Sequence, residues 1–334
     1  VEVISGPNKY SGDIVVPATV TMNDTVYNVV AIGTEAFYNC SSLTSLAIPN
    51  SIKRIGTNAI VGTSSLTAIT LTAPSIEEHC NGELNKLLRQ LGYTIPRILQ
   101  INDNKLSDII IPETVSRISD YAFYNCSSLT SITIPNSIKS IGNHAFYECA
   151  SLKDISIPNS VTTLGQSVFE NCISLKSAYV GNGITSLDNS TFISCSSLES
   201  VTLGGRIVHI GESVFSGCTA LNEITLPASV KSIGENAFAS CTKLYDIYCF
   251  AMEPPTAYES SFANYNAFLH VPCDNQRVYL LDVLFGNFKY IECMGAESEP
   301  VVPDTVIVTP GTTDVTITWP TEDNAYHYVI EIKK

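Results

Sequence analysis

The chain has 334 residues, a formal net charge of -14 and a pI near 4.7. Binding to a nucleic-acid backbone needs clustered Lys and Arg, so we expect no nucleic-acid partner. No apolar run approaches the roughly 20 residues of a membrane-spanning helix, so we expect no membrane span in this chain. A chain of 334 residues is long enough to bury a sizeable core.

The first two copies of a repeat lie near the start of the chain. Phe37 and Cys40 stand three residues apart, and Ile60 and Thr63 occupy the same two positions 23 residues later. A fixed period of this length is typical of a solenoid, because each unit cannot bury its own apolar face and stacks on its neighbours. Any function must then be sought on a long, repeated surface.

A helical insertion is predicted over residues 75–92. Thr63 and Cys126 are 63 positions apart, which is one period of 23 plus 40, so one coil is oversized. Residues 75–78 (Ser-Ile-Glu-Glu) resemble a capping box, and Gly92 can end the helix. Between them, leucines follow at helical spacing: Leu84, Leu87, Leu88 and Leu91.

Six regular copies follow, and each carries a Phe and, three residues later, a Cys. The pairs recur every 23 residues as Phe123 and Cys126, Phe146 and Cys149, Phe169 and Cys172, Phe192 and Cys195, Phe215 and Cys218, and Phe238 and Cys241. We expect these side chains, with Phe37, to form the structural core. Residues 131–134 (Ser-Ile-Thr-Ile) alternate polar and apolar, which predicts a strand with one buried face. One strand per copy, all running the same way, predicts a β-rich α/β solenoid with a parallel sheet.

A glycine stands four residues before the Phe in most copies. It recurs at Gly33, Gly56, Gly142, Gly165, Gly211 and Gly234. We expect a turn with positive φ at this position. Ser119 and Asp188 replace the glycine in two copies, and Asp tolerates the left-handed region better than most residues.

The chain has eleven cysteines. Side chains of a parallel ladder point the same way, whereas a disulfide needs two Cβ atoms that face each other, so we expect the repeat cysteines to be a buried column of free thiols. Four cysteines outside this ladder leave room for one disulfide whose pairing stays open: Cys80, Cys249, Cys273 and Cys293. No Cys-x-x-Cys motif is present, so we expect no metal site.

The outward side chains of the predicted strands form a short-chained, polar and acidic surface. The candidate partner-binding residues on it are Asp108, Ile110, Asp154, Tyr179, Thr202, Glu223, Asp246 and Tyr248. The two tyrosines are its only large aromatic side chains, and such rings carry much of the binding energy in protein interfaces. The alternative is that small β-formers occur here merely because a curved sheet crowds its inner side.

The repeated pattern L-x-x-I-x-I-P-x-x-V-x-x-I-G-x-x-A-F-x-x-C resembles the Treponema-type leucine-rich repeat of BspA-like surface proteins of host-associated anaerobic bacteria. The resemblance covers roughly residues 30–250, and the repeats are assigned to residues 31–250. It implies a right-handed leucine-rich-repeat superhelix, an extracellular or cell-surface location, and adhesion to host matrix proteins, cell-surface proteins or other cells.

The two ends of the repeat array resemble the capping units of that family. The N-terminal β cap is assigned to residues 1–30, on the runs 13–17 and 25–30. The C-terminal capping unit is assigned to residues 251–294, on the runs 254–256, 269–272 and 288–291. Caps are expected because an open solenoid end would expose the stacked core.

The composition changes past Cys293. Residues 295–304 are interpreted as a linker, and residues 315–320 and 326–332 alternate as strands. The segment 305–334 resembles the first half of a fibronectin type III module. It is too short to close a sandwich of about 100 residues, so we expect a partial β-sandwich segment.

The sequence favours a non-catalytic binding scaffold. It has no His-Glu-x-x-His, Gly-x-Ser-x-Gly or P-loop motif, so no catalytic residue and no cofactor is predicted. Glycan binding is the alternative, with Tyr179, Tyr248 or the C-terminal segment stacking on sugar rings. The chain begins at Val1 without a signal segment, so we expect a mature or trimmed form of an exported protein.

Overall fold

The computed structural model describes residues 1–6, 8–67, 69–73, 80, 97–101, 104–105, 107–294, 305–308 and 315–318. The chain divides into two compact units, Val1–Cys293 and Met294–Lys334. In the second unit, β26 (Thr305–Val308) and β27 (Val315–Thr318) pair as an antiparallel hairpin. The predicted linker, the predicted strand 326–332 and, apart from Cys80, the predicted helical insertion lie outside the described residues.

The strands of residues 1–105 form two parallel ladders and one hairpin. The larger sheet has the order β10 (Asn104–Lys105), β9 (Arg97–Ile101), β8 (Ile69–Ala73), β6 (Leu43–Pro49) and β2 (Gly12–Val15), and only β10 is antiparallel to its neighbour. The smaller sheet has the order β1 (Glu2–Val3), β5 (Ala31–Ile32) and β7 (Arg54–Ile55). The hairpin pairs β3 (Thr19–Met22) with β4 (Thr25–Asn28). Between the ladders lies an apolar core in which Phe37 is fully buried against Tyr10, with 5.0 Å between ring centroids.

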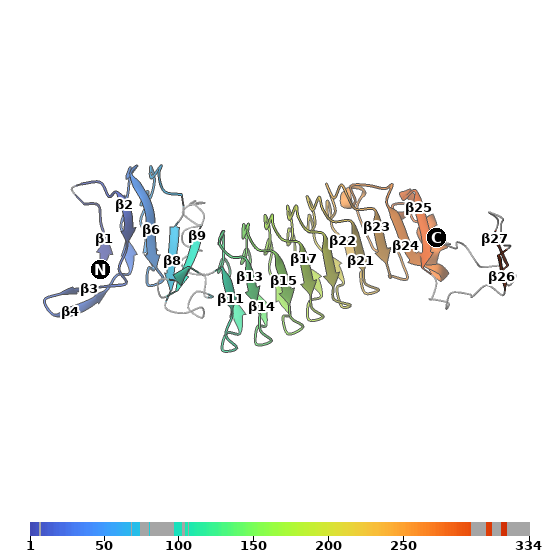
Figure 1. Ribbon diagram of the computed structural model, residues 1–334, viewed down its shortest axis with the longest axis horizontal. Helices are drawn as coiled ribbons and strands as arrows, with labels where there is room; N and C mark the ends of the chain where they lie inside the picture. The colour runs from blue at the N-terminus through green and yellow to red at the C-terminus, as the bar shows by residue number, and fades with distance from the viewer. Residues whose placement is uncertain are drawn as a thin grey trace. The chain divides into compact units, whose positions relative to one another are not determined.

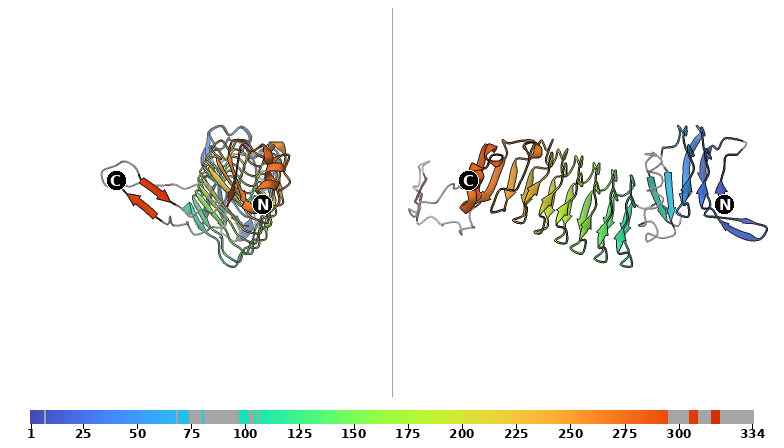
Figure 2. Two further views of the ribbon diagram at one scale, coloured as in Figure 1. Left: turned by 90° about the vertical axis from the view of Figure 1, so that its right-hand side faces the viewer. Right: turned by 180° about the vertical axis from the view of Figure 1, so that it is seen from behind.

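Residues 107–249 form coils with two strands each. One column holds β11 (Asp108–Ile110), β13 (Ser131–Thr133), β15 (Asp154–Ile157), β17 (Ser177–Val180), β19 (Ser200–Leu203), β21 (Glu223–Leu226) and β23 (Asp246–Cys249). The other holds β12 (Arg117–Ile118), β14 (Ser140–Ile141), β16 (Thr163–Leu164), β18 (Ser186–Leu187), β20 (His209–Ile210) and β22 (Ser232–Ile233). Figure 1 shows the coils as a row of parallel arrows, and the end-on panel of Figure 2 shows them superimposed. The predicted solenoid with a parallel sheet is confirmed.

The end of the first unit closes the coil with a short helical segment and two further strands. Its elements are η1 (Glu259–Ser261), β24 (Phe268–Pro272), η2 (Cys273–Asn275), α3 (Gln276–Leu281), η3 (Phe285–Asn287) and β25 (Tyr290–Met294). β24 and then β25 extend the sheet of β21 and β23. A disulfide joins Cys273 to Cys293. Among the described residues no helix combines the length and hydropathy that crossing a membrane requires.

The core of residues 107–294 is built from columns of identical side chains. The six Phe rings from Phe123 to Phe238 are fully buried and stack with centroids 5.2 to 5.6 Å apart. Phe262 from the closing segment continues the column, 5.4 Å from Phe238. Each ring therefore covers the ring of the coil before it, which is the way a repeat without its own core becomes stable.

The repeat cysteines are buried thiols that take no part in the disulfide. The thiol of Cys172 donates a hydrogen bond to the carbonyl oxygen of Phe146 in the preceding coil at 3.2 Å. Equivalent bonds are donated by Cys149, Cys195, Cys218 and Cys241. Burial raises the pKa of Cys172 to about 12. These thiols are small apolar side chains that also connect adjacent coils.

The prediction of positive φ at the repeat glycines is wrong. Positive φ occurs two residues after the glycine and again six residues after it, as at His144 (52°) and Glu148 (55°) in the copy that begins with Gly142. An added Cβ at Gly165 would lie 2.6 Å from the backbone nitrogen of Asn143 in the preceding coil. The glycine is therefore required by the close approach of two backbones.

The interpretation of Asp188 fails for the same reason. Asp188 is absent from the positive-φ residues of the described chain, and Ser190 has the left-handed conformation in that copy, with φ 60°. In the copy that begins with Ser119, Tyr121 has it, with φ 62°. The left-handed turn thus lies at a fixed place in every regular copy and does not need glycine.

Candidate partner-binding face

The outward side chains of one column of strands, β11, β13, β15, β17, β19, β21, β23, β24 and β25, form one surface, which we call the sheet face. Strand residues alternate between buried and solvent-facing, as in Asp154–Ile157. Of the eight candidate residues, six are exposed: Asp108, Ile110, Asp154, Tyr179, Thr202 and Glu223. Asp246 and Tyr248 are half-buried. Ile110 is 76% exposed, so β11 presents an uncovered apolar side chain to solvent.

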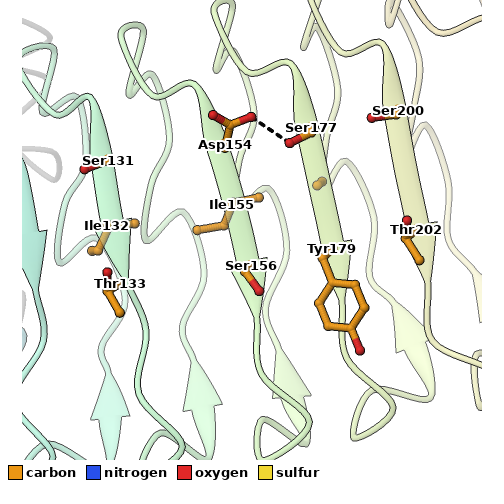
Figure 3. A pocket seen from close by; sticks show the side chains of 11 residues that line it. Ser131, Ile132, Thr133, Asp154, Ile155, Ser156, Ser177, Tyr179, Ser200 and Thr202 are labelled. Carbon is orange, nitrogen blue, oxygen red and sulfur yellow. Dashed lines mark hydrogen bonds between the residues drawn. The ribbon is translucent and has the colours of Figure 1, made fainter.

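A depression of about 390 Å³ lies in the middle of the sheet face, over β13, β15, β17 and β19. Figure 3 shows Ser131, Thr133, Ser156 and Thr202 along it, with the Tyr179 ring projecting from β17. Its lining is thus rich in hydroxyl groups and holds one 40% exposed ring. Such a surface can donate and accept hydrogen bonds and offer one aromatic ring for stacking.

Two acidic candidates on the sheet face connect adjacent coils. The carboxylate of Asp154 accepts a hydrogen bond from the Ser177 hydroxyl at 2.6 Å. The carboxylate of Asp108 accepts one from Ser131 at 2.6 Å and others from Thr130 and Ser107. These bonds hold the pKa of Asp108 below its ordinary value, chiefly through Ser131. Both carboxylates stabilise the coil stack as well as carrying charge to the surface.

The sheet face has a different character at its C-terminal end. We define the aromatic-acidic patch as Tyr248, Phe268, His270 and Tyr290 with Asp246 and Glu292. Phe268 stacks on Tyr290 with 4.6 Å between centroids, and Tyr248 stacks on His270 at 4.4 Å. Asp246 Oδ1 lies 2.9 Å from His270 Nε2, and Glu292 Oε2 lies 3.6 Å from His270 Nδ1. The patch combines ring faces with carboxylates.

Sequence reasoning found only two of these six residues, Asp246 and Tyr248. Phe268, His270, Tyr290 and Glu292 lie in β24 and β25, which the sequence assigns to a cap rather than to the sheet. The alternation of residues 268–272 and 290–292 was the signal that could have placed these side chains on the sheet face. Among the described residues no group of three His, Cys, Asp or Glu side chains could hold a metal ion.

Most of the chain matches a known family model and solved structures. The model of the BspA type leucine rich repeat region matches residues 19–87, 95–222 and 185–294, with six copies. A solved leucine-rich repeat protein of Treponema pallidum is 27% identical, with 63% of this chain and 77% of that chain covered and a TM-score of 0.32. A leucine-rich repeat protein of Bacteroides ovatus is 23% identical, with 86% and 95% covered and a TM-score of 0.33. The pneumococcal vaccine antigen PcpA is 17% identical, with 88% and 91% covered and a TM-score of 0.38. No curated protein matches the chain.

Proposed function

This chain belongs to the BspA-type leucine-rich repeat family, and from that we propose that it is a non-catalytic binding scaffold of the bacterial cell surface or extracellular space. In this proposal the sheet face adheres to host matrix or cell-surface proteins, or to other cells. The observation that supports it best is the exposed row of side chains that continues over parallel strands and surrounds the central depression.

A preformed sheet face suits protein binding on energetic grounds. Stacked strands are already ordered, so contact costs little conformational entropy of the scaffold. Tyr179 offers a large exposed ring that lines the depression, and Ile110 offers an uncovered apolar side chain on β11. Tyr rings are among the side chains that carry most of the binding energy in protein interfaces.

The disulfide between Cys273 and Cys293 supports the extracellular part of the proposal. Disulfides form and persist in oxidising compartments and are rare in reducing ones. The other described cysteines are buried, so they are protected from oxidation by the packing of the coils. Both observations fit a protein that works outside the cell.

Binding of the purified chain to a panel of purified host extracellular-matrix proteins tests the proposal, with biolayer interferometry as the readout. Thr133→Arg and Tyr179→Ala each change the depression, and we expect each to weaken binding by about tenfold, as loss of an interface hot spot does. Gln166→Arg adds the same charge on the exposed loop after β16 and is the matched control. Melting temperatures should stay close to that of the unmodified chain.

Binding that survives both depression variants would reject the sheet face as the adhesive surface. Absence of binding to every panel member would reject adhesion to the matrix proteins tested.

Glycan binding is a second candidate, because the exposed Tyr179 ring lies beside the hydroxyl groups of Ser156 and Thr202. Aromatic rings stack on the apolar faces of sugars, and neighbouring hydroxyl groups can bind sugar hydroxyls. A glycan array with the purified chain and with Tyr179→Ala tests it. A signal that disappears in Tyr179→Ala would support this function over protein adhesion, and an array without signal would reject it.

A further inference from the structure

The aromatic-acidic patch has exposed ring faces that the repeats do not need for packing. Phe268 is 36% exposed and Tyr290 is 38% exposed, although the two rings stack on each other. The core side of the same strand is filled by the buried Leu269 and Val271, so the outward rings do not serve the core. Exposed rings held rigidly on a sheet are a ready surface for a ligand.

The ring of Tyr290 already contacts a cation. The Nζ atom of Lys289 lies 5.1 Å from the centroid of this ring. This distance is within the roughly 6 Å over which an ammonium group is attracted by the electrons of an aromatic face. A cationic side chain from another protein could be bound in the same way on the exposed rings of the patch.

Three carboxylates lie in or beside the patch, those of Asp246, Glu292 and Glu223. Burial raises the pKa of Tyr248 above its ordinary value, and so do the charges of Asp246, Glu223 and Glu292. Glu223 pairs in register with Asp246 across β21 and β23. Within the described residues the Glu223 carboxylate makes no hydrogen bond or ion pair, unlike those of Asp108 and Asp154. The charge of Glu223 is therefore available to a partner, whereas the carboxylates of Asp246 and Glu292 lie beside His270.

We propose that the aromatic-acidic patch, together with Glu223, binds a basic extended segment of a partner protein, with Arg or Lys side chains over Phe268 and Tyr290 and between the carboxylates. This inference rests on the proposed function and names the chemistry of the partner. Arg fits best, because its planar guanidinium stacks on aromatic rings and donates two parallel hydrogen bonds to one carboxylate. The net charge of -14 adds long-range attraction for such a segment.

The spacing of the strands sets the length of the segment. The patch and Glu223 extend over four neighbouring strands, β21, β23, β24 and β25. Neighbouring strands lie about 4.8 Å apart, so the distance across them is about 14 Å, which four to five extended residues span. Side chains at alternate positions of an extended segment point to the same side. The expected motif is therefore basic residues at every second position.

Fluorescence anisotropy with a labelled peptide of alternating Arg and Thr, seven residues long, tests the proposal on the full chain. A peptide with Glu in place of Arg is the negative probe. The combined variant Glu223→Gln, Asp246→Asn and Glu292→Gln removes the three carboxylates, and we expect it to weaken binding by at least about tenfold. The combined variant Glu113→Gln, Glu212→Gln and Glu235→Gln removes three exposed carboxylates outside the patch and should change binding by less than about threefold.

The rings are tested separately. Phe268→Leu with Tyr290→Leu keeps the patch apolar but removes the aromatic faces, and we expect a loss of about fivefold or more. No binding at low salt would overturn the proposal, and so would equal losses in the two charge variants, which would show attraction by net charge alone. A glycan-array signal that depends on Phe268 and Tyr290, without peptide binding, would assign the patch to glycans and overturn it too.

This outcome is separable from that of the proposed function. If a matrix protein binds and is lost with Thr133→Arg but not with the patch variants, the adhesive function stands and the patch proposal fails. If the peptide binds through the patch and no panel protein binds, the adhesive function fails for those partners and the patch remains a site for basic segments.

Discussion

The middle of the sheet face, over β13 to β19, and its C-terminal end, over β21 to β25, carry different chemistry. In the middle, hydroxyl groups surround the depression, and carboxylates such as that of Asp154 are bonded to the next coil. At the end, Tyr248, Phe268 and Tyr290 add rings, and Glu223 has an unbonded carboxylate among the described residues. The regular copies thus use outward carboxylates to hold the stack, whereas at the C-terminal end Asp246 and Glu292 lie against His270 and Glu223 is left for recognition.

The buried core is the same under the middle of the sheet face and under its C-terminal end. The Phe column continues from the regular copies through Phe238 to Phe262 without a change in stacking distance. The patch therefore rests on the same rigid support as the middle of the face. Surface chemistry can change from strand to strand because each coil contacts only its neighbours and the buried Phe column continues beneath the surface.

The largest expected effect is the difference in unfolding free energy between removing a buried ring and removing an exposed one. Phe169 is fully buried between Phe146 and Phe192, so Phe169→Ala should cost about 3–5 kcal/mol of unfolding free energy. Phe268→Ala removes a ring that is 36% exposed and should cost less than about 1.5 kcal/mol. Urea unfolding followed by circular dichroism measures both. A cost below about 1 kcal/mol for Phe169→Ala would contradict its place in the core.

The disulfide should stabilise only the end of the solenoid. It joins Cys273 and Cys293 across a separation of 20 residues, and closing a loop of this size is worth about 3 kcal/mol. The variant Cys273→Ala with Cys293→Ala should speed amide hydrogen exchange in residues 262–294 and lower peptide binding to the patch. Exchange in residues 130–200 should stay unchanged, because contacts in a solenoid reach only neighbouring coils. Faster exchange throughout would show that the two regions unfold together.

Close approach between coils predicts opposite results for two glycines. Gly165→Ala would place a Cβ 2.6 Å from the Asn143 backbone nitrogen, so we expect a loss of about 1–3 kcal/mol. Gly205→Ala meets only the Asn182 side chain at 3.9 Å and should be neutral or stabilising by up to about 1 kcal/mol. Thermal unfolding of both variants measures the contrast. Equal effects would mean that the backbones can separate at no cost.

The repeats were readable from the sequence because one period and one polar–apolar alternation recur in every copy. The burial of the Phe and Cys columns follows from that recurrence. The role of the glycine could not be derived from the recurrence, because a sequence shows where glycine recurs but not whether φ or a neighbouring backbone requires it. Only the stacked coils reveal that Gly165 faces the backbone of Asn143.

The candidate site was readable in part. Alternation placed Asp154 and Tyr179 on the outward side of their strands, where they lie. It did not show that the carboxylate of Asp154 is bonded to Ser177, because that contact depends on register between coils. Nor did it find Phe268 and Tyr290, because the last strands depart from the 23-residue spacing and their pairing is set by tertiary packing.

The smallest expected effect is a pH dependence of stability that comes from one buried thiol. The disulfide-bonded cysteines at the end of the solenoid do not titrate and make no such contribution. Burial raises the pKa of Cys172 from an ordinary value of 9.0 to about 12. The folded state therefore favours the neutral thiol. The unfolding free energy that this preference contributes is complete below pH 9 and declines as pH rises from 9 to 12. Between pH 8 and pH 10 one such thiol should lose about 1.4 kcal/mol of unfolding free energy. Urea titrations of the unmodified chain and of Cys172→Ala at both pH values isolate this amount, because the cavity cost of the variant is the same at each pH and cancels. An identical pH dependence in the two proteins would mean that Cys172 can ionise within the folded coil, and the packing around the thiol column would then be looser than its hydrogen bond to Phe146 indicates.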